Sequence, residues 1–149
     1  MELLLMKQEH LEGVATLERL CFAEPWSAKA LELLLGSGAF ALVCTEGQDV
    51  LAYGGMLSVL VEGQITNIAV HPDHRRRGLG RCVLEAMLQE AARRGLVEIS
   101  LEVRASNAAA IALYEQSGFS CVGRRRNFYK QPTEDALVML RGQATENIE

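Results

Sequence analysis

A basic segment with two glycines, residues 72–80, is the part of the chain best suited to binding an anion. Its key side chains are Arg75, Arg76, Arg77, Gly78 and Gly80. An apolar stretch precedes it and a long amphipathic stretch follows, which indicates a strand, a glycine turn and the start of a helix. Glycines allow a tight turn, so unpaired amides at the helix N-terminus can converge on a diphosphate, where the helix dipole also favours negative charge. A turn that needs glycine for its geometry alone is the other interpretation.

Two common phosphate motifs are excluded at this junction. The chain has no Gly-x-x-x-x-Gly-Lys-Ser/Thr sequence, and Val83 occupies the position that would complete Gly-x-Gly-x-x-Gly. Neither a P-loop nor a dinucleotide fingerprint is therefore present. The remaining pattern is Arg75-x-x-Gly78-x-Gly80.

A second candidate for chemistry is Glu102, in an alternating segment that spans residues 98–103. Alternation predicts a half-buried strand in which Leu101 packs inward and Glu102 lies on the opposite face. Such a glutamate is either simply solvated or, at the edge of a cleft, a general base. In the helix predicted over residues 107–117, Asn107 has the position of an N-cap. Tyr114 falls on the apolar face of that helix, where a tyrosine commonly packs with its hydroxyl at the rim.

The elements that position these residues follow from hydrophobic periodicity and turn signals. Strands are predicted at residues 3–6, 39–45, 50–60, 64–70, 98–103, 121–128 and 136–140. Helices are predicted at residues 11–22, 28–35, 78–94 and 107–117. The order strand, helix, strand, helix in the second half implies a parallel strand pair, whereas the last two strands form a hairpin. We therefore expect an α/β fold with a mixed central sheet of about seven strands and helices on both faces.

Size and charge limit the classes of protein to consider. With 149 residues, 49% of them hydrophobic, the chain can bury one good core but is too short for two ordinary domains. We expect one domain over residues 1–141 and a flexible polar tail over residues 142–149. The net charge of −4 argues against a dedicated nucleic-acid binder. Nothing in the sequence indicates an oligomer, and a monomer is favoured.

The four cysteines and the chain's first residues bear on where the protein works. The cysteines are widely spaced, without a Cys-x-x-Cys pair or a neighbouring histidine cluster, so no metal site is expected and the thiols are predicted to be reduced and mostly buried. The N-terminus lacks the basic region of a signal peptide, and no apolar stretch is long enough to cross a membrane. A cytoplasmic location is expected.

The motifs together resemble those of the GNAT superfamily of N-acetyltransferases. Arg75-x-x-Gly78-x-Gly80 is similar to the acetyl-CoA loop of that family, and residues 102–119 contain an asparagine, an apolar helix, Leu-Tyr and Gly-Phe in the order of the rest of its signature. Pro25-Trp26-Ser27 and the Arg-Arg-Asn-Phe-Tyr run at residues 125–129 are similar to the bacterial ribosomal-protein-alanine N-acetyltransferases, the RimI group. The resemblance implies a single GNAT-like domain that uses acetyl-CoA and no metal.

The same resemblance implies roles for individual residues. The coenzyme's pyrophosphate and pantetheine arm would lie against Ala69, Val70, Arg75, Arg76, Arg77, Gly78, Leu79 and Gly80. Asn107 would touch the coenzyme as well. Glu102 would be the general base, through a water molecule, and Tyr114 would protonate the departing thiolate. His71, beside the coenzyme strand, titrates near neutral pH and is either structural, as is more common for a loop histidine, or part of a proton relay.

The acceptor implied by the resemblance is the N-terminal alanine of a small-subunit ribosomal protein with a basic tail. The acidic balance of the chain suits such a partner. Trp26 and Tyr129 are candidate walls of the peptide groove, although a lone tryptophan is as often part of a core, and Phe128 stands where related sequences often have a second tyrosine. Two alternatives remain: a GNAT enzyme acting on lysine or a small-molecule amine, and a non-catalytic CoA-binding module.

Overall fold

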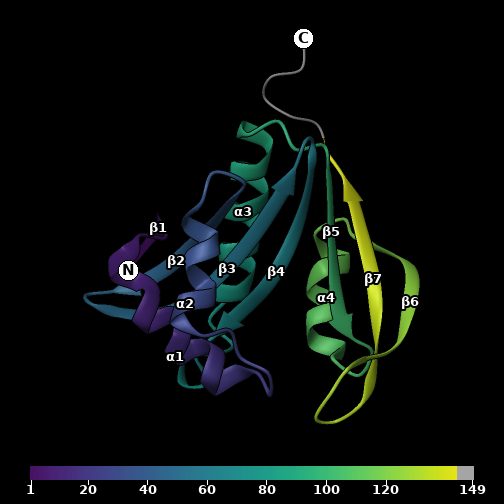
Figure 1. The fold of residues 1–149 in the computed structure, drawn as a ribbon, viewed down its shortest axis with the longest axis horizontal. Coiled ribbons are helices and arrows are strands. Elements are labelled where there is room, and N and C mark those ends of the chain that lie inside the picture. The colour runs from purple at the N-terminus through teal and green to yellow at the C-terminus, as the bar shows by residue number, and fades with distance from the viewer. Residues whose placement is uncertain (144–149) are drawn as a thin grey trace.

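The computed structural model describes residues 1–143, and a seven-stranded sheet forms its centre (Figure 1). The strands lie in the order β1-β2-β3-β4-β5-β7-β6. Their bounds are β1 Glu2–Leu5, β2 Ala39–Glu46, β3 Asp49–Val59, β4 Glu62–Val70, β5 Glu98–Arg104, β6 Ser120–Tyr129 and β7 Glu134–Gly142. The β4–β5 pair is parallel and the other five pairs are antiparallel. This arrangement confirms the predicted α/β fold with a mixed sheet and a C-terminal hairpin.

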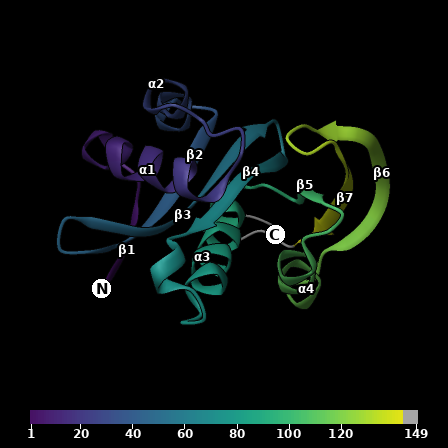
Figure 2. The same ribbon diagram turned by 90° about the horizontal axis from the view of Figure 1, so that it is seen from below.

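Helices cover both faces of the sheet, as expected (Figure 2). On one face lie α1 (Leu11–Cys21) and α2 (Ala28–Leu31), and on the other lie α3 (Leu79–Arg93) and α4 (Ala108–Gln116). Short 3-10 helices occur at η1 (Gln8–His10), η2 (Glu32–Leu35) and η3 (Pro72–His74). The single helix predicted over residues 28–35 is therefore divided, because α2 tightens after one turn into η2 before the chain reaches Gly36.

The core has two parts that correspond to the two helical layers. The apolar face of α3, including Val83, Leu84 and Met87, packs against the strands and reaches Tyr114 and Phe119. On the opposite face, α1 and α2 bury Leu17 and Leu31 among side chains of β2 and β3. The hydrophobic periodicity of the sequence thus predicts which faces of α1 and α3 pack against the sheet.

The sheet opens between β4 and β5. These strands pair only over Glu62–Gln64 and Glu98–Ser100, and Figure 1 shows them diverging beyond that point. In β4, the register with β3 shifts between Gly54 and Met56, so one extra residue is accommodated near Thr66 and Asn67. The bulge and the short parallel pairing leave the second half of β4 unpaired on the side that faces β5.

The end of the described chain belongs to the sheet. Gly142 is the last residue of β7, and the Gln143 amide donates a hydrogen bond of 2.9 Å to the Val97 carbonyl. The polar tail predicted for residues 142–149 therefore starts within the sheet, and residues 144–149 lie outside the described part. No helix within residues 1–143 is both long and apolar enough to span a membrane.

Candidate active site

A cavity of about 540 Å³ occupies the opening between β4 and β5. Its walls come from parts of the chain that are distant in sequence: the segment after α1, the bulged part of β4, the end of β5, α4 and the end of β6. Five of the predicted site residues line it, namely Trp26, Glu102, Asn107, Tyr114 and Tyr129. The coenzyme-loop residues predicted at the end of β4 and the start of α3 do not line this cavity.

Glu102 projects from β5 into the cavity, on the face that alternation predicts. Its side chain is only 15% exposed, and one carboxylate oxygen lies 2.6 Å from the Arg125 Nε on β6. The other oxygen accepts a hydrogen bond of 3.2 Å from the Gln64 amide on β4. The two partners come from opposite sides of the cavity and fix the carboxylate between them, so it has a defined position from which to accept a proton.

Tyr114 reaches the same cavity from α4. Its ring packs edge-on against Phe119, with centroids 5.7 Å apart, and the residue is 7% exposed. Burial raises the pKa of the Tyr114 hydroxyl above its ordinary value, so the phenol is protonated at neutral pH. The structure thus brings a carboxylate and a phenol, twelve residues apart in sequence, to one cavity.

The basic turn has the predicted helix-start geometry. Gly78 is the N-cap of α3 and has a left-handed φ of 77°, which a residue with a Cβ adopts only with strain. An added Cβ at Gly80 would make ordinary van der Waals contacts, 3.6 Å from Val70 and 3.7 Å from Leu113, whereas nothing lies within 4 Å of one added at Gly78. The first amides of α3 have no partner inside the helix.

The arginines of this turn differ in their contacts. Arg75 folds back, donating a hydrogen bond of 3.2 Å from Nε to the Val70 carbonyl and placing Nη2 3.5 Å from the Cys21 sulfur. Arg77 lies 2.8 Å from His74 Nδ1. Arg76, with a left-handed φ of 65°, has no side-chain partner within residues 1–143. Arg76 is therefore the guanidinium of the three that is not already engaged.

The remaining coenzyme candidates lie close to this turn or to the cavity. Ala69 is buried and pairs with Tyr53 of β3, while Val70 pairs with Ala52. Asn107 caps α4 by accepting a hydrogen bond of 3.2 Å from the Ala110 amide, and it also lines the cavity. The N-cap interpretation of Asn107 is therefore confirmed.

The His71 side chain caps the short helix η3, because its Nδ1 accepts a hydrogen bond of 3.1 Å from the Asp73 amide. It does not line the cavity, which agrees with the structural role expected for it.

Trp26, in the segment after α1, and Tyr129, the last residue of β6, stand on two walls of the cavity. Trp26 is half-buried and also packs against the core beneath α1, so it contributes to both. Burial and the nearby Glu102 carboxylate raise the pKa of Tyr129 to about 12. Phe128 stacks edge-on against Tyr129 at 5.0 Å and lines the cavity with it.

A buried carboxylate, Glu18, supports this wall. It is fully buried and accepts hydrogen bonds from the Trp26 amide at 2.8 Å, from the Asn67 side chain at 2.9 Å and from the Tyr53 hydroxyl. It thereby ties the segment after α1 to the bulge of β4. The sequence held one signal of this role, since Glu18 is a charged residue on the otherwise apolar stripe of α1.

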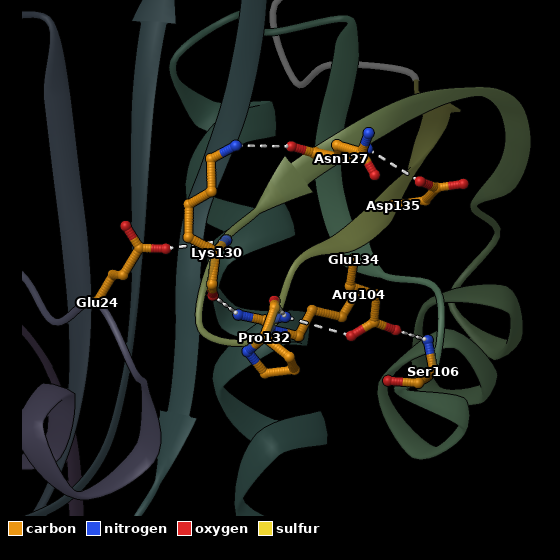
Figure 3. Close-up of polar contacts among 8 residues, drawn as sticks. All are labelled: Glu24, Arg104, Ser106, Asn127, Lys130, Pro132, Glu134 and Asp135. Carbon is orange, nitrogen blue, oxygen red and sulfur yellow. Dashed lines mark hydrogen bonds and ion pairs between the residues drawn. The ribbon is translucent and has the colours of Figure 1, made fainter.

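The segment between α1 and α2, which carries Trp26, also contacts the β6–β7 hairpin, which carries Tyr129. Figure 3 shows the Glu24 carboxylate, from the segment before α2, against the backbone of Lys130 in the β6–β7 hairpin. The Lys130 amide donates this hydrogen bond at 3.2 Å. Nothing in the sequence pattern pairs these residues, which are 106 positions apart. The contact joins the two sides of the cavity at one point.

The four cysteines are free thiols, but their burial was predicted only in part. Cys44 is buried and Cys21 is partly exposed, whereas Cys82 and Cys121 are exposed. The prediction of mostly buried thiols is wrong for the last two, because Cys82 lies at the edge of the α3 stripe and Cys121 on the outermost strand. Within residues 1–143 no group of histidine, cysteine and acidic side chains is arranged to hold a metal ion.

Comparison with known proteins matches the chain to one family. The model of the acetyltransferase (GNAT) family matches residues 11–119. The ribosomal protein bS18-alanine N-acetyltransferase of Salmonella typhimurium is 46% identical over 125 residues, which cover 83% of this chain and 84% of that protein.

Solved structures agree with the match. The crystal structure of the ribosomal-protein-S18-alanine N-acetyltransferase from Escherichia coli aligns with a TM-score of 0.88 and 38% identity, covering 99% of this chain and 98% of that one. A chain of the NatC complex bound to Gag peptide and CoA aligns with a TM-score of 0.81 at 22% identity, over 97% of this chain and 100% of that one. At that identity the second likeness concerns the fold alone.

Proposed function

The chain belongs to the GNAT family of acetyltransferases, and from this premise we propose that it acetylates the N-terminal α-amine of a protein. The acetyl donor is acetyl-CoA, and the acceptor is the N-terminal alanine of a small-subunit ribosomal protein. The observation that carries the proposal is the position of Glu102 and Tyr114 on one cavity, beside the open edge of β4.

In this proposal the coenzyme lies along β4 and ends at the start of α3. The amides of Leu79 and Gly80 and the guanidinium of Arg76 meet the pyrophosphate, because helix N-termini and arginines both favour phosphate. Ala69 and Val70 face the pantetheine arm with the strand edge that β5 leaves unpaired. Arg75 supports the turn through the Val70 carbonyl, and Asn107 meets the coenzyme from α4.

The transfer itself is a direct attack on the thioester. An α-amine has a pKa of about 8, so at neutral pH a large part of it must lose a proton before it can attack. Glu102 takes this proton through a water molecule. The amine nitrogen then bonds to the thioester carbonyl carbon, and a backbone amide near Val70 stabilises the oxyanion. When the carbon–sulfur bond breaks, Tyr114 gives its proton to the departing thiolate, and the second proton lost by the attacking nitrogen restores the phenol as the amide forms.

Support for a protein N-terminus as acceptor comes from the relatives and from the shape of the site. The Salmonella typhimurium and Escherichia coli proteins are named as alanine N-acetyltransferases of a ribosomal protein. The aromatic walls Trp26, Phe128 and Tyr129 suit a peptide backbone, and the net charge of −4 favours a basic tail. A ribosomal substrate would place the enzyme in the cytoplasm.

The test is acetyl transfer from acetyl-CoA to a synthetic peptide that begins with alanine and is rich in arginine. Mass spectrometry with fragmentation locates the added acetyl group, and the same peptide with a blocked N-terminus and an internal lysine is the control. Acetyl on the α-amine, with none on the blocked peptide, is the expected result. Acetylation of the lysine would contradict the proposed acceptor, and coenzyme binding without transfer to any amine would contradict the enzymatic role.

A further inference from the structure

The loop of the β6–β7 hairpin, which follows Tyr129 of the cavity wall, is contacted at several points by one side chain at the end of β5. Arg104 donates hydrogen bonds to the Lys130 carbonyl at 2.8 Å, to the Pro132 carbonyl at 3.0 Å and to Glu134 at 3.2 Å. Figure 3 shows the hairpin loop turning around this guanidinium. Arg104 therefore holds the loop backbone at residues 130 and 132 from the β5 side, while Glu24 contacts the Lys130 amide from the segment before α2.

The same guanidinium also contacts the cavity wall directly. Its central carbon lies 4.5 Å from the centroid of the Tyr129 ring, so Arg104 fixes the ring as well as the loop behind it. Only 26% of the Arg104 side chain is exposed, and the residue lines the cavity two positions after Glu102. Because alternate residues of a strand share a face, the candidate base and this arginine point the same way from β5.

Glu134 extends the anchor to a third element. One of its carboxylate oxygens accepts from Arg104, and the other accepts a hydrogen bond of 2.6 Å from the Ser106 amide. Both contacts lower the pKa of the Glu134 carboxyl, so it stays ionised across the neutral range. Ser106 directly precedes Asn107, the cap of the helix that carries Tyr114. The hairpin, the end of β5 and the start of α4 are thus joined through two side chains.

These contacts require the geometry of arginine. Two carbonyl oxygens and one carboxylate oxygen surround a planar fork whose donors are spread in one plane, while the flat face stacks on Tyr129. A lysine would bring one compact charge, which can reach only part of this set.

We propose that Arg104 is a positioning residue that fixes the β6–β7 hairpin as the acceptor-side wall of the active site, and thereby sets the affinity for the acceptor peptide. This inference rests on the proposed acetyl transfer to a peptide amine. Arg104 acts through Tyr129 and the loop, whereas the coenzyme turn at the start of α3 lies outside its reach.

Arg104→Ala, Arg104→Lys and Glu134→Gln test the proposal in the full chain, with Arg124→Ala as the matched control. Arg124 lies on the same hairpin and pairs with Asp135 at 2.8 Å, but it is 54% exposed and does not line the cavity. Initial rates are measured against peptide and, separately, against acetyl-CoA. Hydrogen exchange of the hairpin amides is followed by mass spectrometry on the same samples.

The expected signature is a split between the two substrates. Arg104→Ala should raise the peptide KM about tenfold or more and leave the acetyl-CoA KM within about twofold. Exchange in residues 128–134 should speed up in Arg104→Ala, less in Arg104→Lys and Glu134→Gln, and not in Arg124→Ala. If Arg104→Ala does not fold, the Lys and Gln variants carry the comparison.

Two results would overturn the proposal. In the first, the peptide KM and the hydrogen exchange of the hairpin are unchanged in the Arg104 variants. In the second, the KM values for peptide and acetyl-CoA rise equally, which would indicate general damage to the fold. Failure of the proposed function is recognised separately, because the wild-type chain would then acetylate no peptide amine. The exchange measurement would still report whether Arg104 anchors the hairpin.

Discussion

Tyr53→Phe is expected to destabilise the protein by about 2 kcal/mol although it removes one oxygen atom and no carbon. Tyr53 is fully buried, and its hydroxyl donates a hydrogen bond to the equally buried Glu18. A hydrogen bond to a charged group contributes about 1.5–3 kcal/mol. The variant leaves Glu18 with the Trp26 amide and the Asn67 side chain as its remaining donors within a fully buried site.

Urea unfolding followed by tryptophan fluorescence measures this loss. Trp26 is the single tryptophan of the chain, and its amide is bonded to Glu18, so the signal arises at the network that the variant perturbs. With a urea m-value of about 2 kcal/mol/M, a loss of 2 kcal/mol lowers the midpoint by about 1 M.

The other two tyrosines, Tyr114 and Tyr129, provide controls that remove the same atom. Neither hydroxyl has a hydrogen-bond partner within residues 1–143, so Tyr114→Phe and Tyr129→Phe should change the unfolding free energy by less than about 0.5 kcal/mol. The reasoning is refuted if Tyr53→Phe unfolds at the wild-type midpoint, or if either control loses as much stability.

Glu102→Gln should lower turnover more than about a hundredfold while coenzyme binding, measured by calorimetry, is kept; near-normal turnover would remove Glu102 as the base. The pKa of Tyr129 is about 12 in the folded protein and about 10 in the unfolded chain. The stability that this pKa difference contributes is complete below pH 10 and is lost as the pH rises towards 12, because the unfolded chain ionises first. Tyr129→Phe should therefore flatten the alkaline fall in unfolding free energy, and an unchanged slope would contradict this. Gly54→Ala should lower the free energy of unfolding in urea by about 1–3 kcal/mol, because the new Cβ would lie 2.9 Å from Val83. Gly80→Ala, whose Cβ makes ordinary contacts, should raise it by about 0.5 kcal/mol. Equal effects of the two substitutions would contradict this steric explanation.

Periodicity and turn chemistry were sufficient to predict the elements and the type of sheet. Alternation predicted that Glu102 and Leu101 lie on opposite faces of β5, and the glycines predicted the start of α3. Both are features of local geometry, which neighbouring residues determine. The division of the second helix at Leu31 was not predictable in this way, because a helix of one turn depends on packing more than on propensity.

The hydrogen-bond and ion-pair partners of the site residues could not be predicted from local sequence patterns. Glu18 is bonded to residues 35 and 49 positions away, and the Glu24 contact spans 106 positions. Arg125 faces Glu102 because β7 lies between β6 and β5 in the sheet. Such pairs follow from strand order and register, which the sequence of one chain does not display directly.

The three paired positions that join β4 to β5 have a consequence for how this enzyme can change over evolutionary time. Everything before the junction, strands β1–β4 with α1 to α3, is one continuous stretch of chain, and β5–β7 with α4 is another. The hairpin that forms one proposed wall of the acceptor site belongs entirely to the second stretch, whereas Trp26 belongs to the first. Substitutions there can alter the proposed contact with the peptide while the turn at the start of α3, built in the first stretch, keeps its geometry. The narrow junction thus lets the hairpin's part of the proposed acceptor site vary without changing the turn at the start of α3.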